Sequence, residues 1–171
     1  MKIIPCLQLA AALAAGLILT NCAGTTPQAA FTQSMPDSAR IAREDRVSTK
    51  VTSSDPKMLP NDQQRLGEKV THKVKSIAQS RGGAARQYEL TVMISRYEKG
   101  NAFARAMLAG LGQIHINGMV TVYQRPGKSK IGEFKLDKTF AWGGIYGGSV
   151  SMDTIEDTYA QAVAEAVSKT K

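Results

Sequence analysis

Apolar and polar residues alternate most clearly over residues 87–99. A period of two predicts a β-strand that buries one of its faces. The same period recurs in residues 114–124 and 131–142, and the turn-forming residues 125–129 between them predict a β-hairpin. A weaker alternation over residues 47–53 predicts one more strand.

Apolar side chains three and four positions apart predict two helices. The first covers residues 61–80 and follows Pro60, a residue suited to the first turn of a helix. The second follows the glycine-rich loop 143–149, and Asp153 and Glu156 stand at its start with the spacing of a capping box.

This order of elements predicts an α/β or α+β fold, with an about four-stranded mixed or antiparallel sheet packed with two to three helices. We expect these elements to form a single globular domain over residues 47–171. Gly118 interrupts the apolar alternation of one strand, which predicts a bulge or the close approach of another part of the backbone.

Residues 1–21 have the three parts of a secretion signal, namely a positive charge at Lys2, an apolar run over residues 7–19 and a short polar end. As a helix, that run would extend about 20 Å, which is too short for a hydrocarbon core of about 30 Å. The sequence therefore predicts a signal peptide that is cleaved.

The segment Leu19-Thr20-Asn21-Cys22 resembles the lipobox of bacterial lipoproteins, in which an aliphatic residue stands three places before a cysteine. Asn21 departs from that pattern, because the residue before the cysteine is usually small. The resemblance implies cleavage before Cys22, a lipid anchor on its sulfur and a domain that faces the periplasm. Ala23, in place of aspartate, implies the outer membrane. A secreted protein that is cut elsewhere is the alternative.

Residues 22–46 are rich in Thr, Ser, Ala, Gln and Pro and show no sustained helical or strand period. This composition predicts a flexible tether that starts at the lipidated Cys22. A flexible chain of this length has a reach of about 25–30 Å.

The chain carries a formal net charge of +8 at pH 7. A basic balance attracts anionic partners, and for an exported protein these are lipid head groups, lipopolysaccharide or peptidoglycan rather than nucleic acid. A role of the charge in solubility alone is the other explanation.

Residues 100–112 form an apolar stretch of mostly small residues, with Arg105 as its one charge. Between two predicted strands, this stretch could be a buried crossover helix, a contact with a partner or a second copy, or a segment that enters a membrane. A helix of about 12 residues is too short to span a bilayer. The candidate contact residues are Asn101, Phe103, Arg105, Met107 and Leu108.

Several positions along the chain carry a resemblance to a known family, namely the strand 90–97, Gly100-Asn101, Arg105, Gly110, Gly112, Val120 and Val122. Through them the chain resembles an uncharacterised family of Gram-negative lipoproteins that share a domain of unknown function. The resemblance covers about residues 45–168, implies an envelope lipoprotein and gives no activity. More distantly, the order of strands and helices is similar to periplasmic domains of the curli-secretion channel and of penicillin-binding-protein activators, which implies partners among envelope proteins.

The sequence contains no arrangement typical of a catalytic or metal site. His72 and His115 lie far apart and neither has a second ligand at metal spacing, and no Gly-x-Ser-x-Gly elbow is present. We therefore expect no cofactor and no catalysis, and a domain that binds or scaffolds other envelope components. The alternatives are a subunit of an oligomeric outer-membrane secretion or channel assembly, which would be a homo-oligomer, and a cell-wall-modifying enzyme.

Overall fold

The computed structural model describes residues 26–108, 111–141 and 144–169. Within them, five strands form one sheet in the order β1-β5-β4-β3-β2, in which β2 runs parallel to β3 and all other neighbours are antiparallel. The strands are β1 (Ala30–Gln33), β2 (Arg46–Ser53), β3 (Gln87–Glu98), β4 (Ile114–Arg125) and β5 (Ser129–Phe140).

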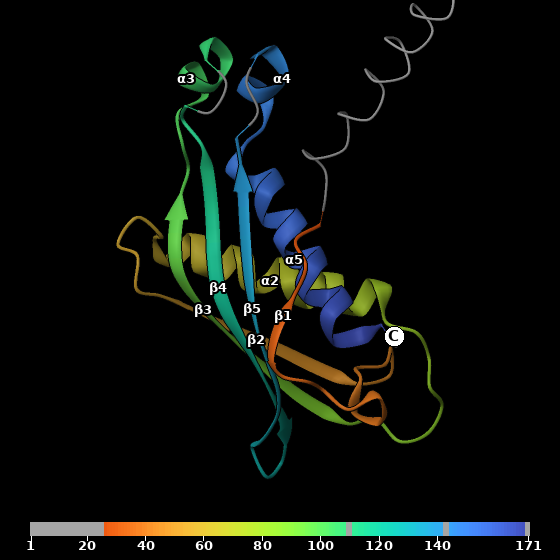
Figure 1. The fold of residues 1–171 in the computed structure, drawn as a ribbon. Coiled ribbons are helices and arrows are strands. Elements are labelled where there is room, and N and C mark those ends of the chain that lie inside the picture. Colours follow the sequence, from red (N-terminus) through yellow and green to blue (C-terminus); the bar gives the residue numbers. More distant parts are fainter. Residues whose placement is uncertain (1–25, 109–110, 142–143, 170–171) are drawn as a thin grey trace, which may run out of the picture.

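Two long helices, α2 (Pro60–Ile77) and α5 (Met152–Ser168), pack together on one face of the sheet (Figure 1). Two short helices, α3 (Ala102–Met107) and α4 (Gly144–Ser149), lie side by side at one end of the sheet. A 3₁₀ turn, η1 (Asp37–Ala39), follows β1. The predicted α+β class with a mixed sheet is confirmed, with one strand more than expected.

The predicted alternation is confirmed in the three long strands, because their apolar positions face the helices and are buried. Trp142, the last residue of the predicted strand 131–142, lies outside the described residues. The strand residues of this core are Tyr88, Leu90, Val92, Ile94, Tyr97, Ile114, Ile116, Val120, Val122, Phe134, Leu136 and Phe140.

Gly118 lies beside a bulge, as predicted, and two side chains approach it closely. The register between β3 and β4 shifts between Ile94 and Arg96, beside this glycine, so a bulge interrupts the ladder there. A Cβ atom at position 118 would lie 2.7 Å from the Tyr159 hydroxyl and 2.9 Å from Ile94 Cδ1. The bulge also turns Tyr97, rather than Arg96, toward the core.

The prediction of a flexible tether is wrong for the part of residues 22–46 that forms structure. Strand β1 pairs with β5, and Met35 and Ile41 are buried in the core. The buried Asp45 carboxylate accepts hydrogen bonds from the backbone N–H groups of Ala42 and Arg86 and pairs with two arginines, which holds this segment on the domain. Residues 1–25, including Cys22, lie outside the described residues.

The start of α5 also differs from the prediction. Ser151 is the N-cap residue, and its side chain accepts a hydrogen bond from the Thr154 N–H. Glu156 is instead fully buried, and its two carboxylate oxygens each accept a 2.8 Å hydrogen bond from the Arg65 guanidinium. The Tyr97 hydroxyl donates a further 2.6 Å bond to the same carboxylate, so Glu156 joins α5 to α2 and β3.

The described residues contain no helix that is both long enough and apolar enough to cross a bilayer. The glycine-rich segment 143–149, predicted as a loop, forms the short helix α4 over residues 144–149.

We expect Gly118→Ala to lower the free energy of unfolding by about 1–3 kcal/mol, because the added methyl group has no room beside Tyr159 and Ile94. Urea denaturation followed by circular dichroism measures this change. The matched control is Gly127→Ala in the β4–β5 turn, where an added Cβ would contact nothing within 4 Å. Equal stability of the two variants would contradict the close approach at Gly118.

Candidate functional site

The end of the molecule formed by residues 100–108, 111–112 and 144–150 is called the tip from here on, and it contains α3 and α4 (Figure 1). Helix α3 begins at Asn101, whose side-chain oxygen accepts a 3.0 Å hydrogen bond from the Ala104 N–H. The Asn101 N–H in turn donates to the Gly112 carbonyl, which closes the connection between β3 and β4 into a compact unit.

Two glycines make this closure sterically feasible. Gly100 and Gly112 have φ angles of 65° and 64°, a region that side chains other than glycine rarely adopt. A Cβ atom at Gly100 would also lie 2.3 Å from the Gly112 carbonyl oxygen. The two glycines therefore allow the backbone conformation in which Asn101 N–H reaches the Gly112 carbonyl.

Arg105 connects the two segments of the tip to each other. Its guanidinium donates to the carbonyl of Gly112, in its own segment, at 2.7 Å. It also donates to the carbonyls of Gly147 and Val150, in the segment between β5 and α5, at 2.9 and 2.8 Å. The residue is only 2% exposed, and burial lowers the pKa of Arg105 from its usual value. The three carbonyl dipoles supply the polar environment that this buried cation requires.

Five apolar side chains of the tip point outward instead. Phe103 is 75% exposed and Ile145, on α4, is 93% exposed. No charged residue other than Arg105 occurs in residues 100–112 or 141–152. Exposed apolar side chains gathered in one place mark interaction surfaces. The exposed apolar residues of the tip are Phe103, Met107, Leu108, Leu111 and Ile145.

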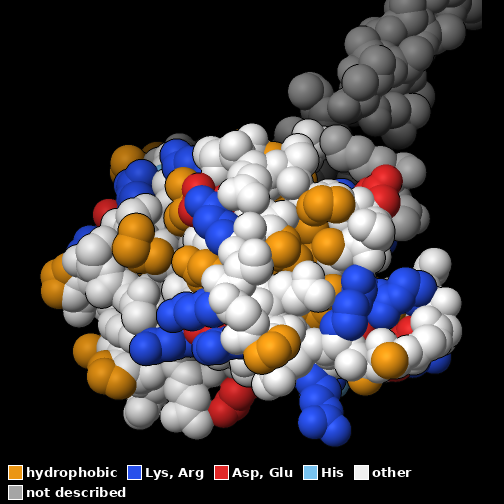
Figure 2. All heavy atoms as spheres, turned by 90° about the horizontal axis from the view of Figure 1, so that it is seen from below, with side chains coloured by type: hydrophobic (Ala, Val, Ile, Leu, Met, Phe, Trp, Pro, Cys, Tyr) orange, Lys and Arg blue, Asp and Glu red, His pale blue; other side chains and the backbone are white. Residues whose placement is uncertain are grey.

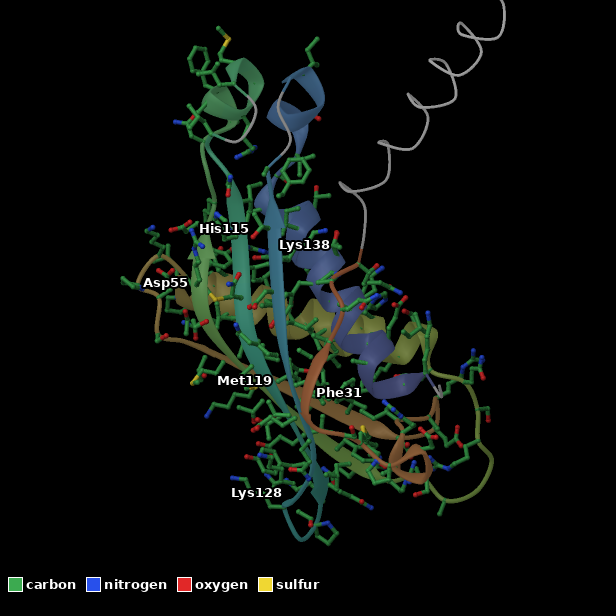
Figure 3. All side chains as sticks on the ribbon, in the orientation of Figure 1. Phe31, Asp55, His115, Met119, Lys128 and Lys138 are labelled. Atoms are coloured by element: carbon green, nitrogen blue, oxygen red, sulfur yellow. The ribbon has the colours of Figure 1, made fainter. Side chains whose placement is uncertain are left out.

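The other end of the molecule has a different character. Figure 2 views the molecule from that end and shows several Lys and Arg side chains with apolar side chains scattered among them. Lys128 lies there, in the turn between β4 and β5 (Figure 3). The turn and the strand ends beside it carry Arg125, Lys128 and Lys130, and this end is called the basic end from here on.

The structure separates the five predicted contact residues into two groups. Phe103, Met107 and Leu108 are exposed, and their role in a contact stays a prediction. Arg105 is buried, so its prediction as a contact residue is corrected to a role in holding the tip. Asn101 is exposed and caps α3, and its role in a contact stays a prediction. Arg105 is the one charge of an apolar segment, and three backbone carbonyls bind it.

Sequence reasoning did not find two exposed residues of the tip. Leu111 belongs to the same apolar segment as Phe103, and its place beside Gly112 in that segment could have marked it as a further contact residue. Ile145 stands among glycines far along the chain, and only the fold brings α4 beside α3.

His115 lies on β4 below the tip, where Figure 3 labels it. Its Nδ1 atom forms a 2.9 Å hydrogen bond with the Thr139 hydroxyl, and burial together with the charge of Arg96 lowers the pKa of His115. Across residues 26–108, 111–141 and 144–169, no group of three His, Cys, Asp or Glu side chains is close enough together to hold a metal ion.

A second surface lies along β2, one of the two edge strands of the sheet. A groove of about 760 Å³ runs between this strand and α2, and its floor includes Val51 and the buried Gly67. In the part of the chain that the structure describes, the outer edge of β2 pairs with no further strand. Such an edge can accept a strand from another chain.

The sequence model of one protein family, the domain of unknown function DUF4410, matches residues 27–144. The chain is a DUF4410 protein. The matched region contains all five strands and starts just before β1, in agreement with the place of β1 in the sheet. Membership of a family of unknown function was predicted and is confirmed.

The DUF4410 protein is similar in fold to PelC of Paraburkholderia phytofirmans, whose structure was described as a dodecamer. One PelC structure has a TM-score of 0.57 at 12% identity, and a PelC variant with one substituted residue has a TM-score of 0.56 at 10% identity. Both similarities cover 85% of this chain and 99% of the PelC chain. Protein XCC0632 of Xanthomonas campestris has a TM-score of 0.46 at 11% identity, over 72% of this chain and 81% of its own. No curated protein sequence matches the DUF4410 protein.

We expect Arg105→Lys to loosen the tip, because an ammonium group cannot reproduce the planar fork of donors that reaches three carbonyls. Backbone amides in residues 100–108 and 144–150 should exchange with deuterium about tenfold faster or more. Mass spectrometry of peptic peptides measures this rate. Arg125→Lys is the matched control, since Arg125 pairs with Glu89 at the surface. Unchanged exchange in Arg105→Lys would contradict the role of Arg105.

Proposed function

We propose that this DUF4410 protein is a lipoprotein of the Gram-negative outer membrane whose periplasmic domain binds or scaffolds other envelope components without catalysis. The tip is its contact surface. The observation that carries this proposal is the set of exposed apolar side chains that two separate segments present at one end of the domain. The Arg105 hydrogen bonds hold these side chains in place before any partner binds, and a preformed surface loses less conformational entropy on binding.

The proposed location rests on the signal peptide over residues 1–21, on the lipobox that ends at Cys22 and on Ala23 after it. A diacylglycerol and a further acyl chain at Cys22 would hold the domain stably at the membrane.

The test places a photo-crosslinking amino acid at Met107 on the tip, in cells that make the full-length protein. We expect irradiation to yield covalent adducts with another envelope component. The matched control is the same amino acid at Met93, a methionine of similar exposure that lies on β3, outside the tip. The proposal fails if Met107 gives no more adduct than Met93.

A second function, a subunit of an oligomeric envelope assembly, is favoured by the open edge of β2 and the groove beside it. The similarity of this fold to PelC, a protein described as a dodecamer, supports the same idea. An obligate contact along β2 would cover an edge that otherwise invites uncontrolled pairing.

For this second function we expect the full-length protein, purified in detergent, to form a defined oligomer in native mass spectrometry. Gln64→Trp places a bulky ring in the groove and should weaken the association at least about tenfold. Gln87→Trp, at an exposed glutamine that does not line the groove, is the matched control. A monomer in both the wild type and the variants would rule out this assembly.

A further inference from the structure

Strand β1 starts on the side of the sheet that carries the tip. It is antiparallel to β5, and Ala30 lies beside Lys135. The chain therefore enters β1 from the end of the sheet toward which β5 runs, the end with Phe140 and α4. In Figure 1, β5 points to the end of the molecule that carries α3 and α4.

The length of this chain suffices to bring Cys22 level with the tip. From Lys135 to Phe140, five residues of β5 cover about 17 Å, and α4 begins four residues later. Cys22 stands eight positions before Ala30, and an extended chain covers at most about 29 Å over eight positions. A lipid on Cys22 and the exposed side chains of the tip can therefore lie in one plane.

The chemistry of the tip matches a lipid surface. Its only charge is the buried Arg105, and its exposed side chains are apolar. These side chains project from two short helices and the residues that follow α3, at the end of the molecule. Side chains of this kind, such as Phe103, Leu108 and Ile145, insert at the boundary between head groups and acyl chains.

We infer that the tip docks into the same lipid monolayer that holds the acyl chains of Cys22, so that the sheet stands upright on the membrane and the basic end points away from it. This inference rests on the proposed lipid anchor at Cys22. It gives the tip a lipid surface as its partner and leaves the β2 groove and the basic end free for other components.

The experiment uses the mature, lipidated full-length protein in vesicles of phosphatidylethanolamine and phosphatidylglycerol. Single cysteines at Met107 and Ile145 carry an environment-sensitive fluorophore, and some vesicles contain lipids with a nitroxide quencher. Cys6 leaves with the signal peptide and Cys22 carries lipid, so each introduced cysteine is the one free thiol. Controls carry the label at Met93 on the sheet or at Lys128 at the basic end.

We expect quenching at Met107 and Ile145 to be at least about threefold stronger than at Met93 and Lys128, since only the tip enters the lipid. Stronger quenching at Lys128 would overturn the inference, because the basic end would then face the membrane. Equal, weak quenching at all four positions would also overturn it. If the photo-crosslinker at Met107 still captures a protein in cells in that case, the proposed function stands and only its lipid partner is wrong.

Discussion

The Arg105 guanidinium determines the shape of the tip, because its burial demands hydrogen bonds that only the backbone of two connections supplies. Leaving a buried cation unpaired is costly, so the segment between β3 and β4 and the segment between β5 and α5 have to stay together. Gly100 and Gly112 allow the tight path that brings the carbonyl of Gly112 to Arg105. With the inner side of the tip occupied by this cation, Phe103 and Met107 of α3 and Ile145 of α4 face outward.

The same principle holds the rest of the domain together at two other places. Glu156 is buried among Arg65 and Tyr97 and joins the two long helices to the sheet. Asp45 is buried directly before β2, and its hydrogen bonds and ion pairs hold the segment that follows β1 on the domain. Each buried charge thus connects segments that are distant in the sequence. In the described part of the chain, no further element covers the tip or the open edge of β2.

The long strands and helices could be predicted from the sequence because their apolar residues repeat with a strand or helix period over ten or more positions. Strand β1 could not, since it is four residues long and only Phe31 packs against the core. Helix α4 is rich in glycine, which is typical of a loop, and tertiary contact with α3 overrides that preference. For the tip, the sequence alone shows the apolar character of residues 100–112. It does not show the burial of Arg105, because the partner carbonyls of Gly147 and Val150 lie more than 40 positions away.

The central claim is that the tip is covered in the cell. Hydroxyl-radical footprinting of whole cells, followed by mass spectrometry, tests it directly by comparing oxidation of Met107 on the tip with oxidation of Met93 on β3, two methionines with exposed fractions of 66% and 54% in the isolated domain. The account predicts that Met107 is oxidised less than Met93 in cells, although Met107 is the more exposed of the two in the isolated domain. Oxidation of Met107 in cells equal to that of Met93 or greater would contradict it.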